Sequence, residues 1–387
     1  MSKLKAFIKS KCEDDSSMAM KLAKIAGYTD RSGFYRFLND PTKETSDIQS
    51  VINIVRELDP TNERAVMCDY IMTLDPNKSV ARQALEYLDV NKFHIERNAL
   101  LDKMKGAHNG KSQEWYKIYS IHSEVQDGNL TYLEAMNKVG SVNTKTPEMN
   151  VFKNILLLYP LCSKGEFGLM SEIADLIDVD SLHITGYVND SYRCRLLIMS
   201  ASAAVSQNKL KRARFNAGMA LSETKIDRFA VFACLHLGNS YIYTSYEKAK
   251  ENFFKGLGYA NASSEYKREI KRSLAMLENV WNKEENEWLD LDSRDTTDMQ
   301  EVAFHHIVNK RNDQARAILN QLDERDSSNH ELAYNTFLRG LVMNDFNCYC
   351  QSVKLFKDAG DKYTLQLPLR NIEKLGADKS LVELIAH

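Results

Sequence analysis

RFAVFACLHLGNSYIYTSYEKAKENFFKGLGYAN, residues 228–261, is the stretch that decides the fold of this chain. Its apolar residues recur at the three- and four-residue spacing of amphipathic helices, and a polar turn divides it into two such helices. The faces predicted to meet carry Cys234, Leu237, Gly238 and Tyr241 on the first helix and Ala249 and Phe253 on the second. Because a residue with little or no side chain lets two helices approach closely, the pattern predicts a tight antiparallel hairpin. Thr244 and Glu247 are expected to form a capping box at the start of its second helix.

The same arrangement of small and large residues recurs on both sides of this hairpin. The copies comprise Leu197, Ala201, Ala204, Ala213, Ala217 and Ala220; Ala303, His306, Ala315, Leu319 and Leu322; Gly340, Met343, Ser352, Phe356 and Ala359; and a degenerate copy in residues 154–177. Helix pairs repeated at about 34 residues are typical of tetratricopeptide repeats. Such units cannot bury their apolar faces alone, so they stack into a curved solenoid whose concave side is lined by the first helices. A surface of this kind binds an extended peptide or a partner helix.

The composition supports an almost entirely helical protein. Only 16 glycines and 6 prolines interrupt 387 residues, and the formal net charge of -2 gives no global preference for nucleic acid. The seven cysteines show no CxxC spacing, which predicts neither a metal site nor a disulfide framework and favours a reduced compartment. No apolar run approaches the length of a membrane span, and the first twenty residues lack the apolar core of a signal peptide. We therefore expect a soluble cytoplasmic protein that has no cofactor and does not bind membranes.

The first forty residues differ from the rest, with eight basic and five acidic side chains. Here residues 20–40, MKLAKIAGYTDRSGFYRFLND, predict two short helices separated by a tight turn at Gly27, with Thr29 as the cap of the second. The four-residue spacing from Ala23 to Gly27 is typical of helix-turn-helix units. Phe34, Phe37 and Leu38 are expected to face inward, and Arg31, Ser32, Tyr35 and Arg36 outward.

Placed in a major groove, this second helix would read DNA from its first turn. Arg31 and Ser32 could contact base edges, Arg36 and Lys24 could pair with phosphates, and Tyr35 lies on the same outward face. The alternative is a capping helical hairpin with a solvated face. We take residues 1–45 as a helix-turn-helix DNA-binding domain.

Two further divisions follow along the chain. Residues 46–140 are expected to form linking helices and irregular helical repeats, beginning with a helix capped at Ser46 and ended by Asp59-Pro60. The polar segment from Ser141 to Pro147 then marks a joint. We assign residues 141–387 to the tetratricopeptide-like solenoid and a terminal helix.

A helix-turn-helix followed by such a solenoid resembles the peptide-responsive regulators of the RRNPP group, and most closely the arbitrium receptor (AimR) family of temperate phages that infect bacilli. The similarity is carried by KTPEMNVFKNILLLYPL (145–161), DRFAVFACLHLGNSYIYTSYEKAKENFFKGL (227–257), ENVWNKEENEW (278–288) and GDKYTLQLPL (360–369). The resemblance implies a homodimer that binds operator DNA containing an inverted repeat and activates a phage gene opposing lysogeny. It further implies that a short secreted signalling peptide enters the solenoid and abolishes this activity, which sets the lysis-lysogeny decision in the host cell.

The resemblance also implies which residues bind the peptide. By similarity these are Ser202, Arg228, Asn239, Asn329 and Asp361, with Arg228 suited to the peptide carboxylate and Asp361 to an arginine or the amino terminus. Relatives carry asparagine where this chain has Ser202 and Ser206, which leaves the sequence of the ligand open. The apolar strip of the last helix, Leu381, Val382, Leu384 and Ile385, is a dimer contact by the same resemblance.

Two other classes of function compete with a regulator. An enzyme is disfavoured because the chain has no GxGxxG, Walker, GxSxG or HExxH motif. Adjacent residues on a helix point about 100 degrees apart, so His305-His306 is a poor joint metal site. A peptide-regulated protein-binding scaffold, whose amino-terminal helices grip a protein and not DNA, is the stronger alternative.

Overall fold

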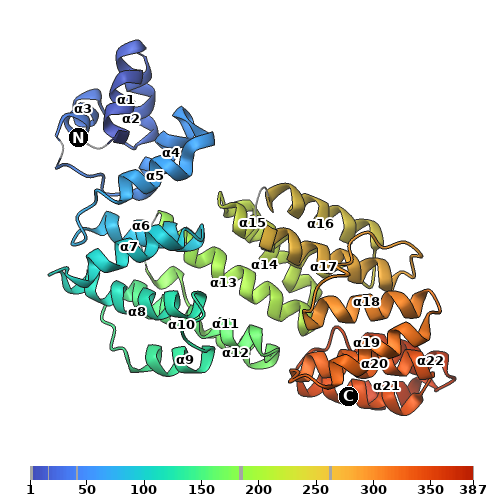
Figure 1. Cartoon of the computed structure of the whole chain (residues 1–387). Coiled ribbons are helices and arrows are strands. Elements are labelled where there is room, and N and C mark those ends of the chain that lie inside the picture. The colour runs from blue at the N-terminus through green and yellow to red at the C-terminus, as the bar shows by residue number, and fades with distance from the viewer. Residues whose placement is uncertain (1–2, 16, 41, 183–185, 261–263, 387) are drawn as a thin grey trace. The chain divides into compact units, whose positions relative to one another are not determined.

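Every regular element in the described residues, 3–15, 17–40, 42–182, 186–260 and 264–386 of this computed structural model, is a helix (Figure 1). This result confirms the predicted all-α class. The helices form two compact units, which are described separately. Unit 1 comprises Met1–Leu156 and Asp178–Tyr192, and unit 2 comprises Leu157–Ile177 and Arg193–His387.

Unit 1 begins with a small bundle and continues through further helices. Its helices are α1 (Lys3–Asp14), α2 (Met18–Ile25), α3 (Arg31–Asn39), α4 (Ile48–Leu58), α5 (Glu63–Ile71), α6 (Ser79–Val90), α7 (His94–Lys105), α8 (Gly110–Gln126), α9 (Tyr132–Ser141) and α10 (Pro147–Leu156), with short 3-10 turns at Pro60–Asn62 and Asp180–Leu182. The polar segment that follows Ser141 connects α9 to α10, and its role as a joint between domains stays a prediction.

Helices α2 and α3 form the predicted crossed pair. Gly27 adopts φ of +75°, the left-handed conformation that only glycine enters without strain, and the turn of the pair therefore lies where the sequence predicted it. Thr29 was the wrong cap, because Asp30 is the N-cap of α3 and its Oδ1 accepts a hydrogen bond from the N–H of Gly33 at 2.8 Å. The carboxylate one residue later satisfies the free N–H of the first turn.

The inward face of α3 is apolar and completely buried. Phe34, Phe37 and Leu38 expose none of their surface, as predicted, and pack against α1 and α2. Lys5 of α1 is also buried, and its ammonium donates to the carbonyl of Asp40 at 2.7 Å while it lies 4.6 Å from the centre of the Phe37 ring. This contact fixes the carboxyl end of α3 against α1 and leaves the opposite face of α3 free of packing.

The rest of unit 1 is held by an aromatic stack and a buried ion pair. Successive ring centres of Trp115, Tyr119, Phe152 and Tyr192 are 5.4, 4.5 and 5.0 Å apart. Arg97 of α7 is fully buried, and its guanidinium lies 3.3 Å from the carboxylate of Asp89. The predicted cap of α4 was wrong, because Asp47 caps this helix and Ser46 does not.

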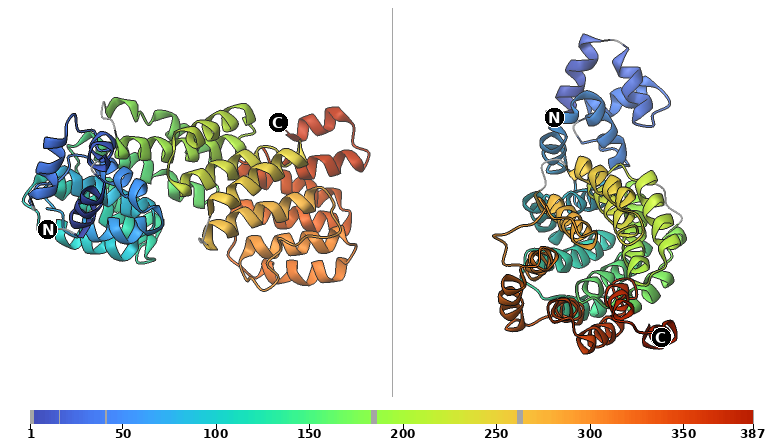
Figure 2. Two further views of the ribbon diagram at one scale, coloured as in Figure 1. Left: turned by 90° about the horizontal axis from the view of Figure 1, so that it is seen from above. Right: turned by 90° about the vertical axis from the view of Figure 1, so that its right-hand side faces the viewer.

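Unit 2 is the array of helical hairpins. Its helices are α11 (Leu158–Ser163), α12 (Phe167–Leu176), α13 (Tyr187–Ser206, in this unit from Arg193), α14 (Leu210–Glu223), α15 (Asp227–Asn239), α16 (Tyr246–Ala260), α17 (Ser264–Val280), α18 (Thr296–Val308), α19 (Asn312–Asp323), α20 (Asn329–Met343), α21 (Phe346–Asp358), α22 (Gln366–Lys374) and α23 (Lys379–Ala386). Consecutive helices from α14 to α21 pack as neighbours, and Figure 2 shows them as a stacked succession. The predicted solenoid of helix pairs is therefore present.

The α15–α16 hairpin packs as the sequence predicted, with Gly238 of α15 against the ring of Phe253 of α16. A Cβ placed on Gly238 would lie 2.5 Å from Cδ1 of Phe253, closer than real Cβ contacts come. Phe253, Ala249 and Cys234 are fully buried around this contact. The absence of a side chain at position 238 thus sets the distance between the two helices.

The contact has counterparts elsewhere in unit 2. Gly256 faces Ile270, and Gly340 faces Tyr349, each with a built Cβ only 2.6 Å from the neighbouring side chain. The pattern residues Ala213, Ala217, Ala220, Ala303, Ala315, Leu319, Leu322, Ser352 and Phe356 expose none of their surface. Met343 is an exception, because it is half exposed at the end of α20.

One local prediction in this unit was wrong. Helix α16 starts one residue later than the capping box required, and the Oγ of Ser245 accepts from the N–H of Lys248 at 3.4 Å, while Thr244 bonds back to the carbonyl of Tyr241.

The range of the degenerate copy, residues 154–177, contains the end of α10 and two short helices, α11 and α12, which pack against each other.

The loop between α21 and α22, residues 359–365, returns to helices far away in the sequence. The N–H of Tyr363 donates to the carbonyl of Ser206 at 3.0 Å, and its hydroxyl donates to the carbonyl of Asn239 at 2.8 Å. The amide of Gln207 donates to the carbonyl of Gly360 at 2.7 Å. This α21–α22 loop therefore connects the last hairpins of unit 2 to the carboxyl ends of α13 and α15.

We predict that Gly238→Ala destabilises the protein by about 2–3 kcal/mol, because the added methyl group forces α15 and α16 apart. Gly258→Ala, in the same hairpin, is the control. Nothing lies within 4 Å of a Cβ at Gly258, so this change should raise the free energy of unfolding by about 0.5–1 kcal/mol. Denaturant unfolding of both variants measures the difference, and equal stabilities would contradict the account.

Candidate functional site

A pocket of about 220 Å³ lies inside unit 2, where the α21–α22 loop meets the inner helices. It is lined by Phe167 of α12, Ser202, Val205 and Ser206 of α13, His236 and Asn239 of α15, Ile242 and Tyr243 of the following turn, Ser273 and Met276 of α17, His330 of α20, and Asp361, Tyr363 and Thr364 of the loop. The first helices of three hairpins, α13, α15 and α20, thus contribute to the lining, as expected for a concave solenoid surface. The volume is below the roughly 300–1,000 Å³ of pockets that enclose a whole small ligand, and it suits one or two residues of a longer one.

The wall of this pocket contains buried polar atoms that have no hydrogen-bond partner. They are Nδ1 of His236, Oδ1 of Asn239 and the hydroxyl of Tyr243. The first two lie on one face of α15, three residues apart, and the third follows in the next turn. A buried polar group without a partner costs about 1–3 kcal/mol, so three around one cavity indicate a surface that awaits polar groups of a ligand.

His236 is neutral in this environment. Its side chain is buried, and removal from water lowers the pKa of the imidazole to about 4. The ring therefore offers one N–H and one lone pair, which match the carbonyl and N–H groups of a peptide backbone. The amide of Asn239 offers the same two functions.

Asp361 contributes a carboxylate of the α21–α22 loop to the pocket lining. It is buried, and its Oδ1 accepts from the backbone N–H groups of Tyr363 and Thr364 at 3.0 and 2.9 Å. Its Oδ2 lies 2.9 Å from Nε2 of His330. The carboxylate thus holds the α21–α22 loop in its turn and joins it to α20.

The structure brings three of the five predicted peptide-binding residues into this pocket. Ser202, Asn239 and Asp361 line it, together with Ser206. Arg228 and Asn329 do not line it. Arg228 lies eleven residues before Asn239 on α15, about 16 Å along the helix axis, and Asn329 is the exposed first residue of α20. The assignment of these five residues to peptide binding stays a prediction.

Several lining residues escaped the sequence analysis. His236 could have been found, because it precedes Asn239 by three residues and so shares its helix face. His330 lies beside Asn329, and only the exact start of α20 decides which of the two faces inward. Tyr363 carried no local signal, since the carbonyls of Ser206 and Asn239, to which it donates, lie more than a hundred residues away.

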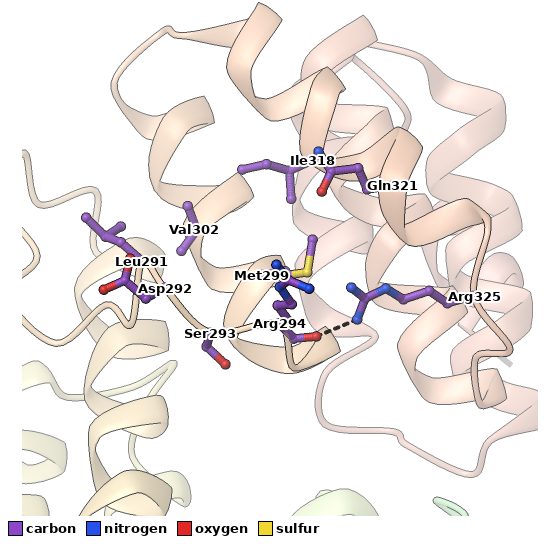
Figure 3. A pocket seen from close by; sticks show the side chains of 9 residues that line it. All are labelled: Leu291, Asp292, Ser293, Arg294, Met299, Val302, Ile318, Gln321 and Arg325. Carbon is purple, nitrogen blue, oxygen red and sulfur yellow. Dashed lines mark hydrogen bonds between the residues drawn. The ribbon is translucent and has the colours of Figure 1, made fainter.

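A second and larger hollow in unit 2, of about 560 Å³, lacks these features (Figure 3). It is lined by Leu291, Asp292, Ser293 and Arg294 of the α17–α18 connection, Met299 and Val302 of α18, and Ile318, Gln321 and Arg325 of α19. Arg325 donates to the carbonyl of Arg294 at 2.6 Å. No side chain of this lining has a buried polar atom without a partner, so the smaller pocket is the better candidate despite its size.

In unit 1, the outward face of α3 presents the predicted DNA-binding residues. Arg31, Ser32 and Arg36 are exposed, Tyr35 is half-buried, and Lys24 is exposed at the end of α2. Neither Lys24 nor Arg31 forms an ion pair with an acidic side chain of the described residues. The geometry leaves these cations available for a polyanion.

The predicted dimer strip on α23 divides into two parts. Val382 is buried in the core of unit 2 and Ile385 packs partly against it, whereas Leu381 and Leu384 are 38% and 75% exposed. Leu381 and Leu384 are therefore the most exposed apolar side chains of this strip.

Comparison with known proteins decides the family. The family model described as "AimR transcriptional regulator-like" matches residues 63–374, most of the chain. The chain belongs to the AimR family. It is 34% identical to the AimR transcriptional regulator of Bacillus phage phi3T over 98% of this chain and 100% of that protein. It is 35% identical to the AimR transcriptional regulator of Bacillus phage SPbeta, with both chains fully covered.

Solved structures of AimR proteins have the same fold. The structure described as SeMet-phAimR superposes with a TM-score of 0.77 at 34% identity and full coverage of both chains. The structure described as phAimR-Ligand gives a TM-score of 0.81 at 32% identity, over 87% of this chain and 100% of that chain. The AimR family thus includes a ligand-bound form, and its members are named as regulators of transcription in phages.

Other kinds of site find no support in the part of the chain that the structure describes. The His, Cys, Asp and Glu side chains of the described residues form no group of three that could hold a metal ion. Among the described helices, none has both the length and the apolar character needed to cross a membrane.

We predict that buried His236 makes the protein less stable as the pH falls from about 6.5 to 4. Its folded pKa, about 4, lies below the ordinary value of about 6.5, so the unfolded chain binds the proton first and is favoured in acid. The loss should reach on the order of 3 kcal/mol and should be absent in His236→Gln. Parallel denaturant unfolding of both proteins at several pH values isolates this contribution from that of other groups. A pH dependence identical in the two proteins would show that His236 is not buried as described.

Proposed function

We propose that this AimR-family chain is a homodimeric regulator of phage transcription that binds operator DNA and is switched off by a short secreted peptide. Its activity in the host cytoplasm would control the lysis-lysogeny decision. The observation that carries the proposal is the unit 2 pocket with three unpaired buried polar atoms, in a family with a ligand-bound member. We further propose that the chain divides into three parts, residues 1–45, 46–140 and 141–387.

A peptide is the ligand that suits the pocket chemistry. Its backbone alternates N–H donors and carbonyl acceptors, which His236 and Asn239 of α15 can pair, while Ser202 and Ser206 of α13 supply hydroxyls. An extended chain advances about 3.3 Å per residue, so about five residues would span the distance from Asn239 to Arg228. Arg228 could then bind the carboxylate at one end of the peptide. Asn329 and Asp361 could bind groups nearer the other end.

Operator binding is the proposed role of α2 and α3. Arg31 and Ser32 are exposed in the first turn of α3, where they would contact base edges, and the exposed Arg36 and Lys24 would neutralise phosphates. A dimer would place two such helices on the halves of an inverted repeat, at a spacing that the dimer fixes. Contact between the two copies is assigned to Leu381 and Leu384, with Val382 and Ile385 supporting α23 from within.

The α21–α22 loop offers a route by which the peptide could change the receptor. One wall of the pocket belongs to α13 and α15, and the other to the loop and α20. A ligand held by both walls favours one curvature of unit 2, and this differential binding is what shifts a conformational equilibrium. A change of curvature would alter the dimer and so the distance between its two DNA-binding heads.

We predict that Arg31→Ala with Arg36→Ala lowers the affinity for operator DNA at least tenfold, because a base contact and a phosphate contact are lost. Operator fragments are selected from phage genomic DNA with the wild-type protein, and gel shifts compare the variants. Lys43→Ala, outside α3, is the matched control and should bind normally. Equal DNA binding by the double variant would remove the assignment of α3 as the helix that reads DNA, and no selection of DNA by the wild type would favour the protein-binding scaffold.

We predict that Asn239→Ala leaves DNA binding intact but weakens peptide binding about tenfold or more. The substitution removes an amide from the pocket lining and leaves the helix packing at Gly238 unchanged. The peptide is first identified by mass spectrometry after affinity selection from a randomised pool of short peptides. Calorimetry then compares Asn239→Ala with Asn312→Ala, which lies on α19 away from the pocket. Unreduced affinity in Asn239→Ala would remove this residue from the site.

We predict that Leu381→Glu with Leu384→Glu converts the dimer to a monomer, because charges replace its exposed apolar strip. Multi-angle light scattering measures the mass at matched concentrations. Leu291→Glu removes an equally exposed leucine elsewhere and should remain dimeric. A dimeric double variant would place the interface on another surface.

A further inference from the structure

Side chains from four other elements hold the end of α15 and the turn that follows it, residues 239–245. The hydroxyl of Tyr363, in the α21–α22 loop, donates to the carbonyl of Asn239 at 2.8 Å. The guanidinium of Arg214, on α14, donates to the carbonyl of Ser240 at 2.8 Å. The first half of this turn is thus bound to two separate elements.

The second half of the turn is held by two more donors. The indole N–H of Trp281, the residue after α17, donates to the carbonyl of Ile242 at 2.8 Å. The guanidinium of Arg370, on α22, donates to the carbonyl of Tyr243 at 3.3 Å and lies 5.5 Å from the centre of the Tyr243 ring. Because Ile242 and Tyr243 line the unit 2 pocket, both donors act on the pocket lining.

Arg370 connects this turn to the last two helices of the chain. Leu367 and Ile372 of α22 belong to the buried core of unit 2, which also includes Val382 of α23. Helix α23 packs against both α21 and α22. A change in the position of α22 would therefore affect both its contact with Tyr243 and the apolar strip of α23.

The contact of Arg370 is separable from the structure of the pocket. Arg370 is exposed, so its side chain fills no part of the core. Its bond to the Tyr243 carbonyl is the longest of the four, and the turn keeps the other three donors when this bond is lost. Removal of the guanidinium should therefore weaken the connection between the turn and α22 without opening the pocket.

We propose that Arg370 is a positioning residue that couples occupancy of the pocket to the association of two copies through α23. This inference rests on the proposed peptide-receptor function and names the side chain that carries its regulation. A ligand that binds Tyr243 favours one position of the turn, and Arg370 makes the position of α22 depend on that turn. Such a coupling is reciprocal, so association of the two copies changes the peptide affinity by the same factor.

The test compares the dimer dissociation constant of the full-length protein with and without a saturating peptide, by analytical ultracentrifugation. The probe is the peptide identified by mass spectrometry after selection from the randomised pool. It should change the constant of the wild type about fivefold or more. In Arg370→Gln the change should be less than about twofold, because a shorter, neutral side chain loses both contacts with Tyr243. Calorimetry on the monomeric protein should give this variant a peptide affinity within about threefold of the wild type, since the pocket lining is intact.

Arg316→Gln is the matched control, because it removes an arginine of α19 whose ion-pair partner is the exposed Asp313. It should respond to the peptide as the wild type does. A wild-type response in Arg370→Gln, or a peptide affinity outside the expected range, overturns the proposal, since Arg370 would then be idle or would support the pocket itself. A wild-type dimer constant that the bound peptide leaves unchanged also overturns it, while the receptor function stands. If no peptide is selected from the pool, the receptor function fails as well.

Discussion

The close approach of two helices at Gly238 is the contact on which the architecture of unit 2 depends. With no side chain there, the ring of Phe253 fills the space that a Cβ would occupy, and the hairpin closes to a fixed distance. Gly256 and Gly340 set equivalent distances at their own interfaces. Because each hairpin packs on the next, these short separations add up to a defined curvature. The curvature in turn brings the α21–α22 loop within hydrogen-bonding distance of α13 and α15.

The hydrogen bonds of that loop to α13 and α15 form the pocket, but some polar atoms of the pocket lining stay without partners. Tyr363 bonds to the carbonyls of Ser206 and Asn239, which holds the two walls together. On one of these walls, Nδ1 of His236 and Oδ1 of Asn239 have no hydrogen-bond partner. Apolar side chains at this site would make the protein more stable. The free-energy cost of the unpaired polar atoms is therefore consistent with a site that binds a polar ligand.

Much of this fold follows from the sequence, because helical periodicity and small residues at fixed positions are local signals. The predicted helix starts were wrong by one residue. Each true cap directly follows the residue predicted for it, which was Thr29, Ser46 or Thr244. That single-residue error matters for the site, since a shift of one position rotates a side chain by about 100 degrees, and His330 faces the pocket where Asn329 was expected. The partners of Tyr363 could not be predicted, because a contact between residues 124 apart has no local signature.

The central claim is that a bound peptide joins the two walls of the unit 2 pocket. The most direct test is hydrogen exchange, read at single residues, of the Tyr363 and Thr364 amides in the α21–α22 loop. With the peptide selected from the randomised pool at saturation, the account predicts that both amides exchange at least tenfold more slowly, because the loop must open before they exchange. Unchanged exchange at these amides in the fully occupied protein, or protection confined to the hollow around Leu291 and Arg325, would contradict it.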